Sequence, residues 1–247
     1  MPAERISKRL ARAGVCSRRE AETLIQQGRV RVNGDIITSP ALNVEATDKI
    51  HVDDEPIKLP DIARLWKYHK PRGLICSTVD DKNRPTIFAD LENHAPHLPR
   101  LMSVGRLDYN SEGLLLLTNS GTLSRHLELP STGWIRRYKV RVLGRPKTDT
   151  LKKLKDGITV EGVVYGSIEA TVDTQKEEGA NVWLIIKLKE GKNREIRKVM
   201  EHVGHPVNRL IRLSYGPFQL GKLNKHEIEE IPESVLKDQF GSAWTTF

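Results

Sequence analysis

The chain is poor in cysteine, in aromatic residues and in long apolar runs. Its two cysteines, Cys16 and Cys76, lie far apart in the 247-residue sequence, which excludes a disulfide framework and a cysteine-based metal site. Two free thiols fit a reducing compartment, so we expect a cytoplasmic protein. No apolar run approaches the roughly 18 residues that a membrane-spanning helix needs, and no membrane association is expected. The basic N-terminus lacks the apolar segment of a secretory signal.

Acidic residues are outnumbered by basic ones. Lysine and arginine total 40 against 32 aspartates and glutamates, which gives a net charge of +8. Such an excess favours a polyanionic partner, although it does not identify one. At this length the chain can hold one large domain, or a small domain followed by a medium one.

Residues 1–60 are predicted to form a separate small module of helices and strands. Ser17 and Glu20 have the spacing of a capping box at the start of a helix. Asn33-Gly34 follows an alternating segment and is a strong hairpin signal. The module is rich in cations, with only Glu20 and Glu22 opposing them between residues 5 and 31. Charged helix faces are common on solvated surfaces, but this imbalance suits contacts with RNA phosphates better. The predicted RNA contacts here are Arg5, Lys8, Arg9, Arg12, Arg18, Arg19, Arg29 and Arg31.

A short string in the middle of the chain combines a glycine, a cation and an acid. Gly105-Arg106-Leu107-Asp108 stands just before the apolar residues 114–117, which have the character of a buried strand. Asp108 is therefore expected in a loop at the mouth of a core strand, where a carboxylate can act from a rigid support. Four residues alone are a weak signal, because most aspartates near glycines are turn residues.

Several flanking segments have simpler patterns. Residues 65–69 alternate like a strand, and residues 74–77 are predicted to continue as another strand. A short helix is expected around residues 87–91. His94 and His97 follow in a loop without a nearby carboxylate or cysteine cluster, so we interpret them as solvent histidines and expect no metal site.

Two later segments carry further candidate residues. Residues 135–142 alternate like a strand, and this pattern alone places Tyr138 in the core as a half-buried aromatic. Residues 190–200 open a helix whose first turns hold Arg194 and Arg197, where the helix dipole disfavours cations. That placement indicates a partner anion, either a phosphate or a carboxylate. Lys192 and Arg194 are added to the predicted RNA contacts.

Longer strings resemble known families. Residues 105–121 resemble the signature of pseudouridine synthases, within them the branch that modifies ribosomal RNA, similar to the bacterial large-subunit type B enzymes. Residues 6–22 and 28–34 resemble the S4 RNA-binding domain, which precedes the catalytic domain in many enzymes of that branch. The Lys-Pro-x-Gly string that begins at Lys70 is also similar to the pseudouridine synthases.

The resemblance implies a set of roles. Asp108 corresponds to the family's catalytic aspartate, Tyr138 lines the active site, and Arg197 pairs with the aspartate. The reaction breaks the N1–C1′ bond of uridine and forms a bond at C5, after the nucleotide flips out of its helix. The carboxylate either bonds to the nucleoside or removes a proton from the ribose, and both routes stay open. Arg106 holds a phosphate or the space that the flipped base leaves. No cofactor is expected.

Two rival functions are weighed. Glu112 lies four residues after Asp108, and paired carboxylates are typical of glycoside hydrolases. Aromatic residues make up only 5% of the chain, however, and its positive charge suits RNA better than neutral sugars. The second rival is a non-catalytic S4-type ribosome-binding or assembly factor, against which the intact Gly-Arg-Leu-Asp string argues.

The prediction is an α+β protein of two parts. Residues 1–60 are expected to form the S4-like domain, and residues 61–247 a catalytic domain with a mixed, largely antiparallel sheet flanked by helices. The expected activity is pseudouridine formation in ribosomal RNA, with 23S RNA preferred. The expected partner is a structured stem-loop, bound by a monomer.

Overall fold

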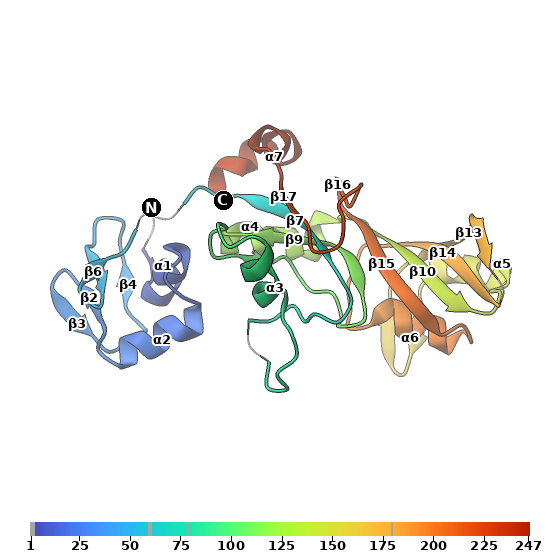
Figure 1. The fold of residues 1–247 in the computed structure, drawn as a ribbon, viewed down its shortest axis with the longest axis horizontal. Coiled ribbons are helices and arrows are strands. Elements are labelled where there is room, and N and C mark those ends of the chain that lie inside the picture. The colour runs from blue at the N-terminus through green and yellow to red at the C-terminus, as the bar shows by residue number, and fades with distance from the viewer. Residues whose placement is uncertain (1–2, 59–60, 79, 179) are drawn as a thin grey trace. The chain divides into compact units, whose positions relative to one another are not determined.

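A computed structural model describes residues 3–58, 61–78, 80–178 and 180–247 (Figure 1). The chain divides into two compact units, which we describe separately. The first contains residues 1–63 together with 119–121 and 247, and the second contains residues 64–118 and 122–246. Within the described part of the chain, no helix has the length and apolar character needed to cross a bilayer.

The first unit packs two helices against short antiparallel strands. Ser17 and Glu20 form the predicted capping box, in which the Ser17 N–H donates to Glu20 Oε2 at 2.6 Å. Asn33 and Gly34 both have positive φ, 54° and 98°, as a tight hairpin turn requires. The elements are β1 (Glu4–Arg5), α1 (Ile6–Arg12), α2 (Arg18–Gln26), β2 (Val30–Val32), β3 (Asp35–Ile37), β4 (Asn43–Val44), β5 (Ile50–Val52) and β6 (Glu55–Pro56). Strands β3-β2-β5-β6 form one sheet, and β1 pairs with β4.

The core of this unit consists of small and branched aliphatic side chains. Helices α1 and α2 turn Ile6, Leu10, Ala21 and Ile25 inward, and none of these four is exposed to solvent. The strands add the residues Val30, Val32, Val44 and Ile50. The polar faces of both helices are left for charged side chains, as the sequence pattern predicts.

The second unit is built on one mixed sheet in the order β13-β14-β10-β15-β9-β7-β17 (Figure 1). Its strands are β7 (Leu65–Lys70), β8 (Met102–Ser103), β9 (Glu112–Thr118), β10 (Arg136–Leu143), β13 (Glu169–Glu178), β14 (Asn181–Leu188), β15 (Val207–Tyr215), β16 (Phe218–Gln219) and β17 (Ile228–Glu230). Strand β9 pairs with β15 in parallel, whereas the other described pairings in this sheet are antiparallel. The prediction of a mixed, largely antiparallel sheet is therefore confirmed.

Helices and a small hairpin accompany this sheet. The helices are α3 (Ile87–His94), α4 (Gly121–Glu128), α5 (Thr148–Lys153), α6 (Glu195–His202) and α7 (Glu233–Phe240), and the hairpin joins β11 (Ile158–Val160) to β12 (Val163–Tyr165). Helix α6 turns Ile196, Val199 and Met200 into the same core as Val140 of β10. This packing fixes the first turn of α6 against the sheet.

Two segments differ from the sequence prediction. Residues 74–77 form no strand, and Ile75 makes an isolated bridge to Thr86 instead. Helix α3 continues to His94, three residues beyond the predicted patch, because Thr86 caps its start and the chain stays helical through the next turn. His94 is exposed, as expected for a solvent histidine, but it lies at the end of α3 and not in a loop. The expectation that no carboxylate lies near it is wrong, since its Nδ1 is 3.5 Å from Asp90 Oδ1 and 2.8 Å from the Asp90 carbonyl oxygen.

Strand β9 is buried along its whole length, and its parallel contact with β15 depends on Gly113. The backbone of Gly113 has φ 106°, and a Cβ atom there would lie 2.4 Å from the carbonyl oxygen of Arg212. No side chain fits between the two strands at this point. Gly113 therefore sets how closely the two halves of the sheet approach each other.

We predict that Gly113→Ala destabilises the protein by about 3 kcal/mol, because the new methyl group meets backbone and the left-handed φ disfavours alanine. Gly162→Ala is the matched control, since Gly162 also has positive φ but nothing lies within 4 Å of its added Cβ. The control should lose only about 1 kcal/mol. Denaturant unfolding of both variants measures the difference, and equal losses would contradict the close-approach argument.

Candidate active site

The loop before β9 presents Asp108, as the sequence predicts. The Val104 N–H donates to the Leu116 carbonyl at 2.9 Å and fixes the beginning of this loop on the sheet. A turn follows in which the Ser111 N–H donates to the Asp108 carbonyl at 3.0 Å. The Asp108 side chain is one-third exposed, at 33%. The carboxylate is thus accessible, while its backbone is held by a fully buried strand.

Lys70, at the end of β7, anchors this loop by hydrogen bonds to its backbone. Its side chain is completely buried, and its ammonium donates to the carbonyl oxygens of Pro71, Asp108 and Ser111 at 3.0, 3.2 and 3.0 Å. Burial lowers the pKa of Lys70 to about 8, so the ammonium is still mostly protonated at neutral pH. Three charge-assisted hydrogen bonds from one buried donor fix the turn that carries the carboxylate.

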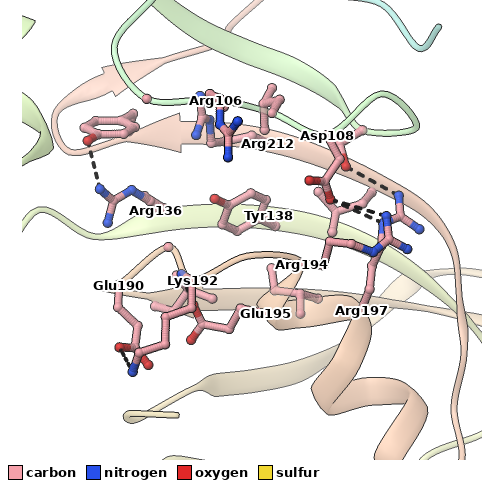
Figure 2. A pocket seen from close by; sticks show the side chains of 18 of the residues that line it. Arg106, Asp108, Arg136, Tyr138, Glu190, Lys192, Arg194, Glu195, Arg197 and Arg212 are labelled. Atoms are coloured by element: carbon pink, nitrogen blue, oxygen red, sulfur yellow. Dashed lines mark hydrogen bonds and ion pairs between the residues drawn. The ribbon is translucent and has the colours of Figure 1, made fainter. Parts of the chain in front are cut away.

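Two arginines from the start of α6 face Asp108 (Figure 2). Arg197 Nε lies 3.8 Å from Asp108 Oδ2, and Arg194 Nη1 lies 3.9 Å from the same oxygen. Arg197 is only 11% exposed, and it also donates to the Asn110 carbonyl at 3.0 Å. Its buried Nε has no hydrogen-bond partner among the described residues and is directed at the carboxylate. The predicted pairing of Arg197 with Asp108 is present as an ion pair without a direct hydrogen bond.

The charge of Arg197 survives its burial. Burial and the neighbouring Arg194 lower the pKa of Arg197, whereas Asp108 acts in the opposite direction. An arginine remains protonated at neutral pH even after such a shift. The first turn of α6 therefore supplies two cations to one carboxylate, which accounts for their unfavourable position relative to the helix dipole.

A pocket of about 440 Å³ opens around these groups. Asp108, Arg106 and Tyr138 line it together with Arg197, so the structure brings the predicted catalytic and supporting residues to one cavity (Figure 2). Cations outnumber carboxylates in this lining. The cations are Arg106, Arg136, Lys189, Lys192, Arg194, Arg197 and Arg212, and the carboxylates are Asp108, Glu128, Glu190 and Glu195. Such a cavity favours an anionic ligand such as a nucleotide with its phosphates.

Tyr138 belongs both to the core and to the pocket wall. It stands on β10 between Ile186 of β14 and Arg212 of β15, and its side chain is buried. The alternation of β10 places it in the core, as predicted, and the cavity reaches its exposed edge. An aromatic ring in this position offers a flat surface beside the catalytic carboxylate.

Glu190 and Glu195 form the acidic part of the pocket with Lys192 between them. Lys192 donates from Nζ to Glu190 Oε2 at 2.5 Å and from its backbone N–H to Glu195 Oε2 at 2.9 Å. Burial raises the pKa of Glu195 to about 7, and the charge of Glu190 adds to this effect. The other oxygen of Glu195 is buried without a hydrogen-bond partner among the described residues. Lys192, predicted as an RNA contact, is thus paired within the protein.

Glu112 does not share the pocket with Asp108. It is 1% exposed and lies 2.5 Å from Arg209 Nε and 3.3 Å from Lys225 Nζ. Burial raises the pKa of Glu112, but its hydrogen bonds and ion pairs with these two cations outweigh burial and lower it. A permanently ionised, paired carboxylate is a poor general acid. The arrangement argues against the glycoside hydrolase reading.

The predicted cations of the first unit have unequal environments. Lys8, Arg9 and Arg12 gather around Glu4, with nitrogen–oxygen distances of 3.3, 3.8 and 2.7 Å. Arg9 is 6% exposed, so its side chain is placed to stabilise the fold and not to contact a ligand. The sequence argument counted acids only within residues 5–31 and therefore missed Glu4.

The strand arginines of this unit are paired as well. Arg29 lies 2.5 Å from Asp53, and Arg31 lies 3.0 Å from Asp54. Arg5 donates to the Ala41 carbonyl at 2.6 Å. At the start of α2, two exposed cations have no carboxylate partner within the described ranges, and these are Arg18 and Arg19.

Several functional residues were missed by sequence reasoning. Lys70 belongs to the Lys-Pro-x-Gly string, which was noted without a role for its lysine. Arg212 is 3% exposed, lines the pocket, and donates to the Leu114 carbonyl at 2.7 Å. Arg136 donates to the Tyr215 hydroxyl at 2.8 Å and stands over its ring. Both arginines lie in alternating strands, where only the pairing of β10 with β15 shows that they reach the cavity.

Comparison with known proteins assigns both parts of the chain to known families. Residues 64–202 match the model of the RNA pseudouridylate synthase family, and residues 4–60 match the S4 domain. An RNA pseudouridine synthase of Rickettsia bellii, named as uncharacterized, is 44% identical over 234 residues, covering 95% of this chain and 99% of the relative. Ribosomal large subunit pseudouridine synthase B of Yersinia pestis is 40% identical over 226 residues, covering 89% and 69%.

The fold agrees with this relationship. The crystal structure of a pseudouridylate synthase is similar, with a TM-score of 0.64 and 25% identity, and the likeness covers 94% of this chain and 98% of the other. The family match defines the class of the second unit, that of the RNA-modifying isomerases. The chain belongs to the RNA pseudouridine synthase family, and it carries an S4 domain in front of the synthase domain. The predicted family and activity are confirmed.

We predict that Lys70→Met lowers the rate of pseudouridine formation by about 100-fold, because a displacement of the carboxylate by about 1 Å has that effect. Loss of the ammonium leaves buried carbonyl oxygens unsatisfied and should also destabilise the protein by about 3 kcal/mol. Lys67→Met is the control, since Lys67 lies on the same strand and pairs with Glu229 at 3.1 Å.

Single-turnover assays at a temperature where both lysine variants are folded separate activity from stability. RNA binding should persist in both variants, because Lys70 contacts only backbone of its own chain. A folded Lys70→Met enzyme with the rate of the parent would contradict the positioning role.

Proposed function

We propose that this enzyme converts a specific uridine of large-subunit ribosomal RNA into pseudouridine. The relatives named as ribosomal large subunit pseudouridine synthase B support this choice of RNA. The observation that carries the proposal is the accessible Asp108 carboxylate beside two guanidinium groups in a cationic pocket. We further propose that the enzyme acts as a cytoplasmic monomer on a structured stem-loop.

The chemistry needs a carboxylate beside the sugar of an unstacked nucleotide. A pocket of about 440 Å³ that is walled by Tyr138 suits a flipped uridine, which costs a few kcal/mol of stacking. Asp108 either bonds covalently to the nucleoside or takes a proton from the ribose as the N1–C1′ bond breaks. The detached uracil then turns and forms its new bond to C1′ through C5, while the bond to Asp108 breaks or, on the other route, the ribose regains its proton. C5 loses its hydrogen as a proton, and N1 takes up a proton. The product has the same atoms as the substrate.

Arg197 and Arg194 act on the carboxylate rather than on the base. Their positive charges favour the ionised form of Asp108 that both routes require. Distances of 3.8 and 3.9 Å leave the carboxylate free to move toward a substrate. Catalytic contacts in an unliganded enzyme are often longer than those in the complex.

Tyr138 and Arg106 are proposed to hold the nucleotide. The ring of Tyr138 offers a stacking surface for uracil, and its hydroxyl can relay a proton. Arg106 is exposed at the rim of the pocket, where it can bind a phosphate or fill the gap that the flipped base leaves. Arg194 and Lys192 are proposed to contact the RNA backbone at the opposite rim.

The two predicted domains, residues 1–60 and 61–247, are proposed to have different functions. We propose that the first part binds RNA by charge and the second performs the reaction. In the first part, the exposed Arg18 and Arg19 are the strongest candidates for phosphate contacts, because the other cations have partners in the protein.

We predict that Asp108→Asn abolishes pseudouridine formation and leaves RNA binding intact, because the amide can neither attack the nucleoside nor accept its proton. Asp149→Asn, at an exposed position in α5, is the matched control and should keep full activity. Reverse-transcription stops after cyanoethylation of ribosomal RNA detect the mass-neutral product.

The same assay separates the rival functions. Release of free base or sugar by the parent enzyme would favour hydrolysis. Binding of RNA by the parent without any product would favour an assembly factor. A fully active Asp108→Asn enzyme would refute the assignment of the catalytic residue.

We predict that deletion of residues 1–60 weakens RNA affinity and flattens its salt dependence, while the single-turnover rate at saturating RNA stays unchanged. In the full chain, replacing both Arg18 and Arg19 by alanine should reduce the slope of log K against log salt by about one to two. Arg29→Ala is the control, since Asp53 already neutralises that cation. An unchanged slope in the double variant would contradict the phosphate-binding role of α2.

A further inference from the structure

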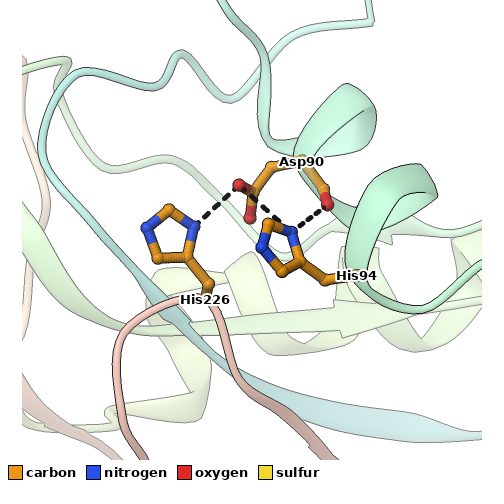
Figure 3. Close-up of side chains that lie close together, drawn as sticks. All are labelled: Asp90, His94 and His226. Carbon is orange, nitrogen blue, oxygen red and sulfur yellow. Dashed lines mark hydrogen bonds and ion pairs between the residues drawn. The ribbon is translucent and has the colours of Figure 1, made fainter.

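Outside the pocket around Asp108, three side chains of types that can bind metals lie close together (Figure 3). Asp90 and His94 lie one turn apart on α3, and His226 comes from the loop before β17. Each of the three offers one ligand atom, and these atoms all lie within 4.8 Å of one another. The synthase reaction proposed above makes no use of this cluster.

Both imidazole rings turn their Nδ1 atoms toward the Asp90 carboxylate (Figure 3). His226 Nδ1 lies 2.7 Å from Asp90 Oδ1, and His94 Nδ1 lies 3.5 Å from the same oxygen. The two rings are stacked with 5.1 Å between their centroids. One carboxylate oxygen therefore faces two histidine nitrogens from segments that are far apart in the sequence.

The carboxylate of Asp90 is held in place from the opposite side. The Tyr68 hydroxyl, which is fully buried in β7, donates to Asp90 Oδ2 at 2.5 Å. The Asp90 side chain itself is only 9% exposed. The hydrogen bond from Tyr68 uses one oxygen and directs the other, Oδ1, at the histidines. A carboxylate ligand oriented by a hydroxyl is a common arrangement around protein-bound metals.

His226 is held toward the cluster by an unusual backbone conformation. Its φ is 70°, in the left-handed region that few residues other than glycine adopt. Hydrogen bonds with β7 fix this conformation, since the His226 N–H donates to the His69 carbonyl and the His69 N–H donates to the Glu227 carbonyl, both at 3.0 Å. Such strained conformations tend to occur where a side chain must point in a particular direction.

We propose that Asp90, His94 and His226 form a binding site for a divalent transition-metal ion of the zinc class. Tetrahedral zinc with bonds of 2.0 to 2.2 Å needs ligand atoms about 3.3 Å apart. His94 Nδ1 lies 3.5 Å from Asp90 Oδ1, close to that value, whereas His226 Nδ1 lies at the hydrogen-bond distance of 2.7 Å. Without metal both Nδ1 atoms donate to Asp90, His226 to Oδ1 and His94 to the backbone carbonyl oxygen at 2.8 Å. Binding of the ion requires each ring to carry its hydrogen on Nε2 instead, after which both Nδ1 lone pairs can face the ion.

The cluster also has space for a fourth ligand. His94 and His226 line a second pocket, of about 760 Å³, whose wall includes His97. Water from this pocket, or the His97 imidazole, can complete a tetrahedral site. Two imidazoles with one carboxylate favour zinc, nickel or copper over calcium and magnesium, which prefer all-oxygen ligands.

The test is calorimetric titration of the full-length, chelator-treated protein with Zn²⁺. We expect one ion per chain with a dissociation constant below about 100 µM, and loss of at least tenfold in affinity in His94→Ala and in His226→Asn. Asparagine tolerates the left-handed backbone at residue 226, so this variant removes the imidazole with little risk to folding. Tyr68→Phe should keep the stoichiometry and weaken binding by about tenfold, because Asp90 loses its orienting hydroxyl.

His202→Ala is the matched control, since His202 and His205 are a second histidine pair close together in the sequence. Zinc affinity should be unchanged in His202→Ala. A loss of zinc affinity in this variant would assign the ion to His202 and His205 and would overturn the proposal. The absorption of bound Co²⁺ between about 500 and 650 nm provides a second readout of a tetrahedral site. Melting curves without metal show whether each variant is folded. Equal zinc affinity in the parent, His94→Ala and His226→Asn would also overturn the proposed metal site.

Discussion

One buried ammonium group, that of Lys70, fixes the turn that carries the Asp108 carboxylate. Lys70 donates to three backbone carbonyl oxygens, and two of them belong to the turn that carries Asp108. An unpaired cation in this position would be very unfavourable, so the turn must close around it with its carbonyl oxygens inward. The side chain of Asp108 is thereby pushed outward, toward the pocket. The exposed carboxylate is a consequence of how its own backbone solvates a buried charge.

The opposite wall of the pocket is set by a different constraint. Strands β9 and β15 run side by side in parallel at Gly113, where no side chain separates them. Strand β15 is paired in turn with β10, which carries Tyr138, and α6 packs on the same half of the sheet. The distance from Asp108 to the guanidinium of Arg197 therefore depends on the approach of two backbones. A rigid sheet is a better means of fixing such a distance than two mobile loops.

The sequence allowed the local features to be predicted. The capping box at Ser17 and the loop position of Asp108 both follow from patterns within a few residues, and both are present. Long-range features were missed, because they depend on pairing that no local pattern reveals. Lys70 reaches Asp108 across 38 positions. His226 reaches Asp90 across 136 positions, so no local pattern places the two together. Asp90 lies only four residues before His94 and was missed because the predicted helix stopped at residue 91.

Charged side chains are arranged differently in the first unit and in the pocket around Asp108. In the first unit Lys8, Arg9 and Arg12 share the single carboxylate of Glu4, and Arg29 and Arg31 each pair with an aspartate, so few of the predicted cations are unpaired there. In the catalytic pocket, by contrast, arginines gather around a single accessible carboxylate. A polyanion is drawn to this pocket by the excess of positive charge, yet Asp108 itself repels phosphate. In the proposed function the RNA backbone lies on the rim arginines and a neutral base and sugar reach the carboxylate, which agrees with this distribution of charge.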